Sequence, residues 1–480
     1  MSVPLRAPDT SATPSSAPAR RVAGRAGTAA PSWLSPSSLS LLVPIEHDAE
    51  GLTAALHAHG DTMSASVLAH VRTLHFLRMQ VLPGAREGSP PRVLVNLVHD
   101  DSAAAHLDEL LQHWGDWLLD LFRRHSGCPC ERPAGLRDWL LTFVVAEKTI
   151  HRGRAGASAD TIRAEVALRK VVADFVDTRR SAWGPTTPPE AIRAEIRDHV
   201  RALANTEVPT ERRPAPPPDD RRSERLDRVL FFADPASGML NREIRAWALP
   251  PGNRFTPGQR RLREVGLWAH WLYTLVPVWI SRGIFRYLEY TQDDTHLEPS
   301  PEQLQRLLTR EDHQIQNPLT MFSTVRDGWL RTFVFSRVLA SADKAARHLW
   351  KTGRLAGIDT IHYARFLHID DGRRMLFLSD YDGSWERYLG DFLTSGSVAV
   401  VPIWTHLQGC APTRYAFETT PGFGRRFLAM TRHDQVPVQV WYSAFPKLSL
   451  SNMLANARLR EGLYAEQLSP DDARAWLQEL

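Results

Sequence analysis

A histidine and an arginine recur at the same spacing in two distant parts of the chain. The pattern Thr-x-His-x-x-Arg occurs once with His75 and Arg78 and again with His362 and Arg365. Histidine can transfer protons near neutral pH, and arginine can stabilise a developing negative charge. Both occurrences lie in stretches with strand-like composition, where a buried His or Arg costs free energy unless it is paired. We therefore take His75, Arg78 and Arg365 as candidate catalytic groups.

Two aspartates are placed to pair with these side chains. Asp100 and Asp382 follow the next predicted strand in each part of the chain and stand shortly before Ser102 and Ser384. A carboxylate beside an imidazole or a guanidinium stabilises its charged form and can orient it, so Asp382 is a further catalytic candidate. The alternative is a structural network that fixes each hairpin to the next helix, or Asp and Ser acting only as N-caps of that helix.

The repeat extends well beyond these motifs. The first copy is predicted to contain strands at 40–45, 73–82, 92–99 and 140–149, and helices at 49–59, 102–124 and 158–177 with Ser158 as N-cap. The second copy is predicted to contain strands at 319–325, 360–369, 374–380 and 436–443, and helices at 329–350, from Ser384 onward, and at 449–463. Both read β-α-β-β-α-β-α. Matches in one order, with one length difference in a turn, indicate an ancient duplication.

A βαββαβ unit is the ferredoxin-like arrangement, an antiparallel sheet with helices on one face. The other face must also be buried, and two copies in one chain can bury each other's open faces. The sequence therefore predicts an α+β fold of two ferredoxin-like repeats packed as an intramolecular α+β barrel, with a helical insert. Neither face of the stretch 361–369 is simply polar, as expected for a strand covered on both sides. The space between the sheets is the expected pocket.

These elements also divide the chain into domains. We expect a disordered N-terminal tail (1–38), a first ferredoxin-like repeat (39–182), a linker that is Pro-rich toward its end (183–225), a helical insert (226–316) and a second ferredoxin-like repeat (317–480). The tail is rich in Arg and Ser and poor in acids, which is also typical of an organelle transit peptide. We interpret it as a disordered tail.

The segment 379–383 leads to a family resemblance. It reads Ser-Asp-Tyr-Asp-Gly. With the duplicated architecture, it resembles the dye-decolourising peroxidases, haem enzymes built from two ferredoxin-like modules with a Gly-x-x-Asp-Gly motif near the haem. Asp382 and Gly383 match the end of that motif, whereas Ser379 stands in place of its first Gly. The resemblance implies a haem-dependent oxidoreductase, a peroxidase or oxygenase, acting on a small apolar substrate.

Haem would need a neutral His as axial ligand and an Asp or Arg that assists peroxide cleavage. On this resemblance His362, His368 and His406 are the candidate haem ligands, with Arg365 and Asp382 as helpers. His368 stands close to two aspartates at the predicted strand end, so the alternative for it is an exposed position in a turn.

The insert suggests a different function. Trp268, Trp271 and Trp279 recur at helical spacing, with arginines on both sides. The uncharged stretch is too short to span a bilayer, which needs about 20 residues, but Trp with flanking Arg suits the membrane interface. The alternative is a helix packed on the protein's own core and kinked at Pro277. The apolar and basic helix at 329–350 would share the same surface.

Composition limits the function classes. Hydrophobic residues make up 43% and charged residues 23% of 480, with a formal net charge of +4, the balance of a soluble globular protein. Acids are mixed with the arginines, which argues against a dedicated nucleic-acid binder. The three Cys exclude a disulfide framework and complete no zinc site, so no metal is expected. We expect a cytoplasmic protein, with a peripheral position at the membrane as a further option.

Three functions follow from these observations. The first is an oxidoreductase of the α+β barrel type, haem-dependent if the resemblance holds. The second is a non-catalytic membrane-surface binding or scaffold protein. The third is a cofactor-free barrel monooxygenase or isomerase that uses a buried His and Arg alone.

Overall fold

The computed structural model describes residues 37–60, 64–84, 89–184, 186–203, 256–259, 261–262, 264–265, 283–348, 353–355, 357–394, 397–416 and 418–480. The predicted tail up to residue 36, most of the predicted linker and the membrane-interface candidates Trp268, Trp271 and Trp279 lie outside these residues. The described chain is α+β, with two four-stranded antiparallel sheets and a two-stranded ribbon of β8 (Thr413–Arg414) and β9 (Glu418–Thr419).

Sheet A joins three strands of the N-terminal half to one strand of the C-terminal half. Its order is β1 (Ser37–Pro44), β3 (Arg92–His99), β2 (Leu74–Leu82) and β10 (Val440–Ser443). All neighbouring strands are antiparallel. The predicted strands at 40–45, 73–82 and 92–99 are therefore confirmed, but the fourth strand of this sheet comes from the other end of the chain.

Sheet B shows the reciprocal exchange. Its order is β4 (Thr149–Arg152), β6 (Ile361–Ile369), β7 (Arg374–Asp382) and β5 (Gln316–Thr324), again antiparallel throughout. The strand β4 belongs to the N-terminal half, whereas its three partners belong to the C-terminal half. Each half thus contributes its fourth strand to the sheet of the other half.

The expected strand at 140–149 is wrong for most of its length. The helix α4 (Pro133–Leu141) covers its start, with a Pro in the first turn, where a missing N–H costs nothing. Leu136 and Leu140 of this helix are buried at helical spacing. The apolar run read as the start of a strand is therefore the end of a helix. The strand expected at 436–443 likewise begins only at Val440.

The segments that lead into the exchanged strands bond to the outer edges of the sheets. Val144, which precedes β4, forms an antiparallel bridge with Leu41 on the edge of sheet A. Gln435, which precedes β10, forms the equivalent bridge with Met321 on the edge of sheet B. Backbone hydrogen bonds therefore connect the two sheets along two seams, one at each side.

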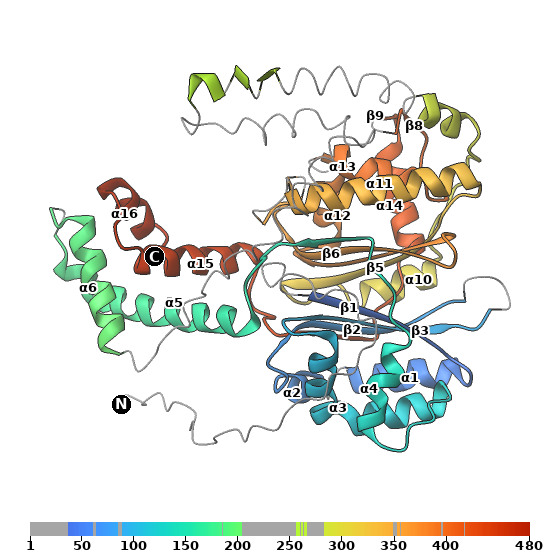
Figure 1. Cartoon of the computed structure of the whole chain (residues 1–480), viewed down its shortest axis with the longest axis horizontal. Helices are drawn as coiled ribbons and strands as arrows, with labels where there is room; N and C mark the ends of the chain where they lie inside the picture. The colour runs from blue at the N-terminus through green and yellow to red at the C-terminus, as the bar shows by residue number, and fades with distance from the viewer. Residues whose placement is uncertain are drawn as a thin grey trace.

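Helices cover the outer face of each sheet, and the inner faces meet (Figure 1). The helices α1 (Ala49–Gly60), α2 (Ser64–Leu68), α3 (Ala103–His125) and α4 lie under sheet A. The helices α11 (Trp329–His348), α12 (Trp385–Thr394), α13 (Ser397–Trp404) and α14 (Phe423–Asp434) lie over sheet B. Aliphatic side chains from both sheets, together with Phe322, fill one end of the space between them: Leu42, Leu82, Leu94, Phe322, Leu367, Ile369, Leu376 and Leu378.

The sequence of α3 shows why these helices lie flat on a sheet. Ser102 is its N-cap and accepts a hydrogen bond from the Ala105 amide. Its buried side chains recur every three or four residues, so one apolar stripe faces sheet A. The predicted helix at 102–124 is confirmed.

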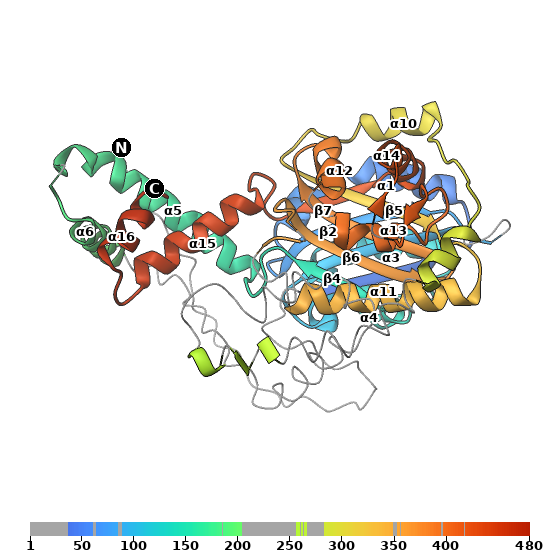
Figure 2. The same cartoon turned by 90° about the horizontal axis from the view of Figure 1, so that it is seen from above.

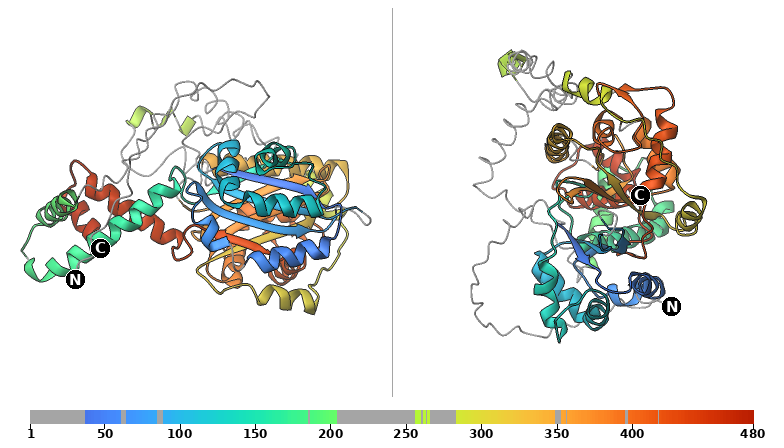
Figure 3. Two further views of the ribbon diagram at one scale, coloured as in Figure 1. Left: turned by 90° about the horizontal axis from the view of Figure 1, so that it is seen from below. Right: turned by 90° about the vertical axis from the view of Figure 1, so that its right-hand side faces the viewer.

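Four further helices form an arm that projects from the two sheets (Figures 1 and 2, and Figure 3 from below and from the side). The arm consists of α5 (Ala159–Arg179), α6 (Pro189–Ala202), α15 (Leu450–Tyr464) and α16 (Pro470–Leu477), with a short 3-10 turn at 180–182. Ser158 and Ser449 are the N-caps of α5 and α15. Each of these two helices follows one exchanged strand, and they pack on each other through a shared apolar cluster. The remaining labelled helix, α10 (Pro301–Leu308), precedes β5.

Candidate functional site

The two His–Asp pairs have the same geometry in both halves of the chain. His75 Nε2 lies 2.7 Å from Asp100 Oδ1, and His362 Nε2 lies 2.7 Å from Asp382 Oδ1. The histidines lie on the central strands β2 and β6, and both are buried. The pairing of His with Asp expected from the sequence is confirmed.

The second oxygen of each aspartate binds the first amide of an arm helix. Asp100 Oδ2 accepts a hydrogen bond from Ala159 N of α5 at 2.8 Å, and Asp382 Oδ2 accepts one from Leu450 N of α15 at 2.7 Å. A carboxylate at a helix N-terminus interacts favourably with the helix dipole. Each His–Asp pair thus anchors an arm helix to a central strand.

The helices that directly follow these aspartates are capped by other residues. Ser102 caps α3, and Ser384 accepts a hydrogen bond from Arg387 N at the start of α12. The alternative in which Asp100 and Asp382 cap the next helix is therefore wrong, because their carboxylates reach the arm instead. Gly383 has a φ of 84°, a conformation that favours glycine, which accounts for the Asp-Gly dipeptide as part of a turn.

A second polar cluster lies between the inner faces of the two sheets. Asp380 of β7 accepts hydrogen bonds from Arg78 of β2 and, at 3.1 Å, from Arg365 of β6. The Asp380 and Arg365 side chains are fully buried, and that of Arg78 is nearly so. Because Arg78 and Asp380 belong to different halves of the chain, this cluster joins the facing sheets directly.

The two arginines of this cluster are satisfied to different degrees. Besides Asp380, Arg78 donates to Leu319 O, Thr320 Oγ1 and Ser379 O at 2.7–3.1 Å. Arg365 donates only through Nη2, and its Nε and Nη1 have no hydrogen-bond partner among the described residues. In the N-terminal half of the chain, the side-chain amide of Asn96 donates hydrogen bonds to Leu39 O and Ser40 Oγ of β1.

The charges of the cluster stabilise one another. Burial lowers the pKa of Arg78 below its ordinary value, although the Asp380 carboxylate opposes this effect. Burial alone would raise the pKa of Asp380, but the positive charges of Arg78 and Arg365 hold it below its usual range. Asp380 is therefore ionised at neutral pH, and the cluster holds two cations on one anion.

Sequence reasoning missed Asp380 as the partner of the arginines. When Asp100 is aligned with Asp382, Val98 takes the position of Asp380. Only one of the two halves therefore carries an acid at this position. Alternation along β7 was a usable signal, because Leu376, Leu378 and Asp380 share one face of the strand. A search for polar residues that break the repeat would have found it.

The other two candidate haem ligands lie on the opposite side of sheet B. His368 Nε2 bonds to Gly372 O at 2.7 Å, within the hairpin turn, and its ring packs on Phe335. His406 also packs on Phe335, is 1% exposed, and neither of its ring nitrogens has a partner in the described chain. Burial, with the nearby charges of Arg331 and Arg326, lowers the pKa of His406 to about 3.

None of the three candidate haem ligands lines one of the larger clefts in the described part of the chain. The Nε2 atoms of His362 and His368 are already hydrogen-bonded, and the ring of His406 packs against two aromatic rings. The void described inside the core of sheet B has a volume of about 20 Å3, whereas pockets for cofactors span roughly 300–1,000 Å3. Haem therefore remains a prediction from the sequence.

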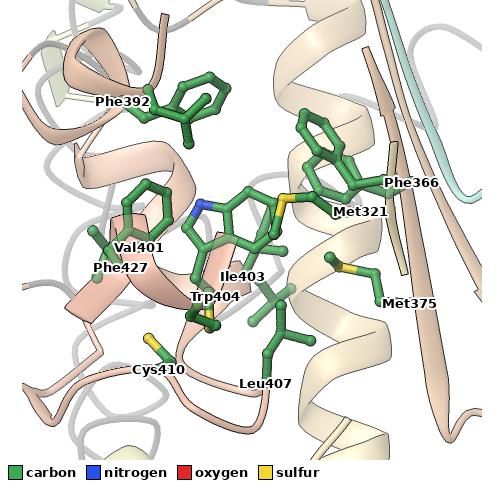
Figure 4. Close-up of a cluster of buried hydrophobic side chains, with 14 of the residues drawn as sticks. Met321, Phe366, Met375, Phe392, Val401, Ile403, Trp404, Leu407, Cys410 and Phe427 are labelled. Atoms are coloured by element: carbon green, nitrogen blue, oxygen red, sulfur yellow. The ribbon is translucent and has the colours of Figure 1, made fainter. Parts of the chain in front are cut away.

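That void lies between sheet B and its helices, in an aromatic core. Figure 4 shows part of this core, where Trp404 of α13 is surrounded by Phe392, Phe427 and Met321. The void is lined by Thr149, His151, Ala342, Ala346, Leu355, Ala364, Phe366, Phe377, Phe392 and Ile403. His151 is buried, and its Nε2 has no partner among the described residues. Burial and the charge of Arg152 lower the pKa of His151 to about 3, so the imidazole is neutral.

The equivalent position in sheet A is filled. His151 pairs in register with Ala364, whereas Tyr442 pairs in register with Leu77 in sheet A. Leu77 and Ala364 match in the repeated Thr-x-His-x-x-Arg motif. Leu77 and Tyr442 belong to the packed cluster between sheet A and its helices. The larger side chains therefore occupy the space that sheet B leaves open. The sequence analysis singled out neither His151 nor Ala364.

Open clefts lie outside the sheets. One of about 500 Å3 runs between α10 and the segment that leads into β10, with Arg306, Arg310 and Trp441 on its wall. A second, of about 470 Å3, continues along the same seam. A third, of about 440 Å3, has Tyr287 and Trp329 on its rim. No group of three or more His, Cys, Asp or Glu suited to a metal ion occurs in the described residues.

The surface predicted to accompany the insert is aromatic and less basic than expected. Trp329 and Phe333 of α11 are 82% and 60% exposed, and Tyr287 and Tyr290, which belong to the predicted insert, are exposed as well. Arg331, expected on this surface, is instead buried and donates to carbonyl oxygens of the core. No helix among the described residues has the length and apolar character needed to cross a membrane.

Comparisons with known proteins give no family: no family model, curated protein or solved structure matches the chain.

Proposed function

We propose that the chain is a duplicated ferredoxin-like barrel that acts as an oxidoreductase on a small apolar molecule, with its reacting space between sheet B and helices α11–α13. The fold proposal is supported by the repeated element order, the exchanged strands β4 and β10, and the two bonded seams. A likeness to the dye-decolourising peroxidases is part of this proposal at the level of architecture.

The placement of the reacting space rests on one observation, the His151–Ala364 pair. A neutral imidazole whose Nε2 has no partner among the described residues lies in an apolar wall of sheet B, and the equivalent pair in sheet A is filled by Tyr442 and Leu77. Such a nitrogen can make one hydrogen bond to a bound molecule and orient it. The His–Asp pairs and the Arg–Asp–Arg cluster stabilise the fold around this space, because their hydrogen bonds connect strands and helices.

Oxygen uptake and ligand-induced stabilisation test this proposal. The full chain is incubated with a panel of small phenols and quinols, after its absorption spectrum has been recorded with and without added haemin. We expect at least one compound to raise Tm and to support oxygen uptake, and the oxygen uptake to be lost in His151→Phe. Tyr442→Phe, at the matched position in sheet A, is the control and should leave both unchanged.

Two outcomes would contradict the proposal. If no compound changed Tm or oxygen uptake of the wild-type chain, the reacting space would have no support. If the protein showed a Soret band that His406→Ala altered while His151→Phe did not, the chemistry would belong to haem at another site.

A second function is favoured by the exposed aromatic side chains Trp329 and Phe333. They lie one helical turn apart on α11, and aromatic rings of this kind insert into the membrane interface. Liposome flotation of the full chain should decrease in the double variant Trp329→Ser/Phe333→Ser and in a variant lacking Trp268, Trp271 and Trp279. The control Leu308→Ser removes an exposed apolar side chain of α10. Equal flotation of all variants would contradict membrane binding through these aromatic side chains.

A further inference from the structure

The void beside His151 is large enough for a very small molecule. Its volume is about 20 Å3, and roughly 10–15 Å3 is needed to admit a single water-sized molecule. It therefore has room for at least one such molecule. The side chains that line it come from the exchanged strand β4, from β6 and β7, and from helices α11, α12 and α13.

The lining of the void favours an apolar occupant over water. A buried water usually makes about three hydrogen bonds. Only Thr149 and His151 bring polar side chains to the void, and the Thr149 hydroxyl already donates to Leu339 O at 2.9 Å. The rest of the wall is alanine, leucine, isoleucine and phenylalanine. A water molecule there would lack partners, whereas a small apolar gas would lose nothing on leaving the solvent.

The duplication shows which residue opens the void. Sheet A carries Leu77 where sheet B carries Ala364, on the face that the helices cover. The three extra carbon atoms of a leucine side chain at residue 364 would occupy the space beside His151. The void is thus specific to one copy, although the strand positions are shared.

We infer that the void is a binding site for a single small apolar gas molecule, dioxygen in the proposed reaction, held against His151 Nε2, which has no partner among the described residues. This inference rests on the proposed function only for the identity of the gas, because the void itself follows from the packing. It names the second reactant of that function and gives it a place between sheet B and its helices.

Xenon is the probe for the site. Crystals of the full chain pressurised with xenon should show one xenon atom among Ala364, Phe366 and Ile403, and crystals of Ala364→Leu should not. The variant Leu77→Ala, which opens the matched position of sheet A, is the positive control and should gain a xenon atom there. Ala364→Val, a smaller change, is used if Ala364→Leu fails to give a cooperative thermal transition.

Dissolved oxygen tests the same site in solution. Methyl groups close to bound dioxygen relax faster in oxygenated than in nitrogen-purged buffer, so the Ala364 methyl should show a several-fold larger acceleration than the Leu77 methyls. His151→Leu should retain xenon and reduce the oxygen effect, because it removes the ring nitrogens with little change in side-chain volume.

The failures of the two proposals are distinguishable. Wild-type crystals without xenon, while Leu77→Ala crystals contain it, would overturn the gas site. Xenon bound equally in wild type and Ala364→Leu would overturn it as well. Gas binding without any oxygen uptake would leave the site standing and remove the oxidoreductase. Oxygen uptake that Ala364→Leu leaves unchanged would support the oxidoreductase and contradict the gas site.

Discussion

At the same register position, sheet A carries Leu77 beside Tyr442 and sheet B carries Ala364 beside His151. The first pair is part of an apolar core, and the second borders a void beside an imidazole whose Nε2 has no partner in the described part of the chain. The frame around both pairs is the same, since each copy keeps its His–Asp anchor. The two halves therefore share this frame and differ in the side chains on the sheet face that the helices cover.

A second pair of positions shows the same division between geometry and chemistry. His99 and His106 stack in one copy with ring centroids 4.6 Å apart, and Tyr381 and Tyr388 stack at the matching positions with centroids 4.0 Å apart. In both cases a strand end packs on the first turn of the following helix. The ring stack holds the helix in place, and its polar atoms are free to differ between the copies.

The largest effect is expected from the acid that only one copy possesses. Asp380→Asn leaves two buried guanidiniums without their carboxylate, so the free energy of unfolding should fall by about 3–5 kcal/mol. The control is Asp370→Asn, which removes a partly exposed partner of Arg92 and should cost at most about 1 kcal/mol. Urea unfolding of both variants measures the difference, and equal losses would refute a special role for Asp380.

The second largest effect is a difference in unfolding free energy between variants of the two arginines. Arg78→Met leaves Leu319 O, Ser379 O and part of Asp380 without donors. Arg365→Met removes one hydrogen bond to Asp380 and two nitrogens, Nε and Nη1, that have no partner in the described chain. We expect Arg78→Met to cost about 1–3 kcal/mol more than Arg365→Met in denaturant unfolding. A larger loss for Arg365→Met would mean that its free N–H groups are bound in solution.

The two aspartate anchors should be equivalent. Asp100→Asn and Asp382→Asn each weaken one bond to an arm-helix amide and one to a histidine, at about 1–2 kcal/mol each. Hydrogen exchange of the first turns of α5 and α15 measures the local effect. If Asp382→Asn abolished an activity that Asp100→Asn left intact, Asp382 would have a catalytic role as the sequence suggested.

The last effect develops only as the pH is lowered, as a slope of stability against pH that distinguishes His151 from Tyr442. The folded-state pKa of His151 is lowered to about 3, whereas the unfolded chain binds its proton near pH 6.5. The unfolded state therefore holds more protons between these values, and stability falls as the pH falls through that window. His151→Tyr, which copies sheet A, should reduce the slope between pH 6 and 4 by about 1.4 kcal/mol per pH unit. An unchanged slope would show that His151 is protonated in the folded chain.

The repeated motif was enough to predict most elements, because strands and helices with one buried face leave a clear period in the sequence. The stretches 73–82 and 360–369 became β2 and β6, and Ser158 became an N-cap as expected. The fourth strands were harder to predict, since β4 and β10 are only four residues long and pair with the other copy. Pairing between residues hundreds of positions apart leaves no local pattern.

The candidate site was predicted in part for a similar reason. His75, His362 and their aspartates stand out because the motif repeats, and repetition preserves what holds the frame. His151, Ala364 and Asp380 are the positions where the copies differ, so a search for similarity passes over them. Comparing the two copies for their differences is the signal that points to them.

A double-mutant cycle between Arg78 and Asp380 tests most directly whether the two halves close face to face. The two residues lie on facing sheets, in different copies of the repeat. Unfolding free energies are measured for wild type, Arg78→Met, Asp380→Asn and the double variant. We predict a coupling energy of about 2–3 kcal/mol. Effects that add to within about 0.5 kcal/mol would show that the residues do not interact and would contradict the shared interior.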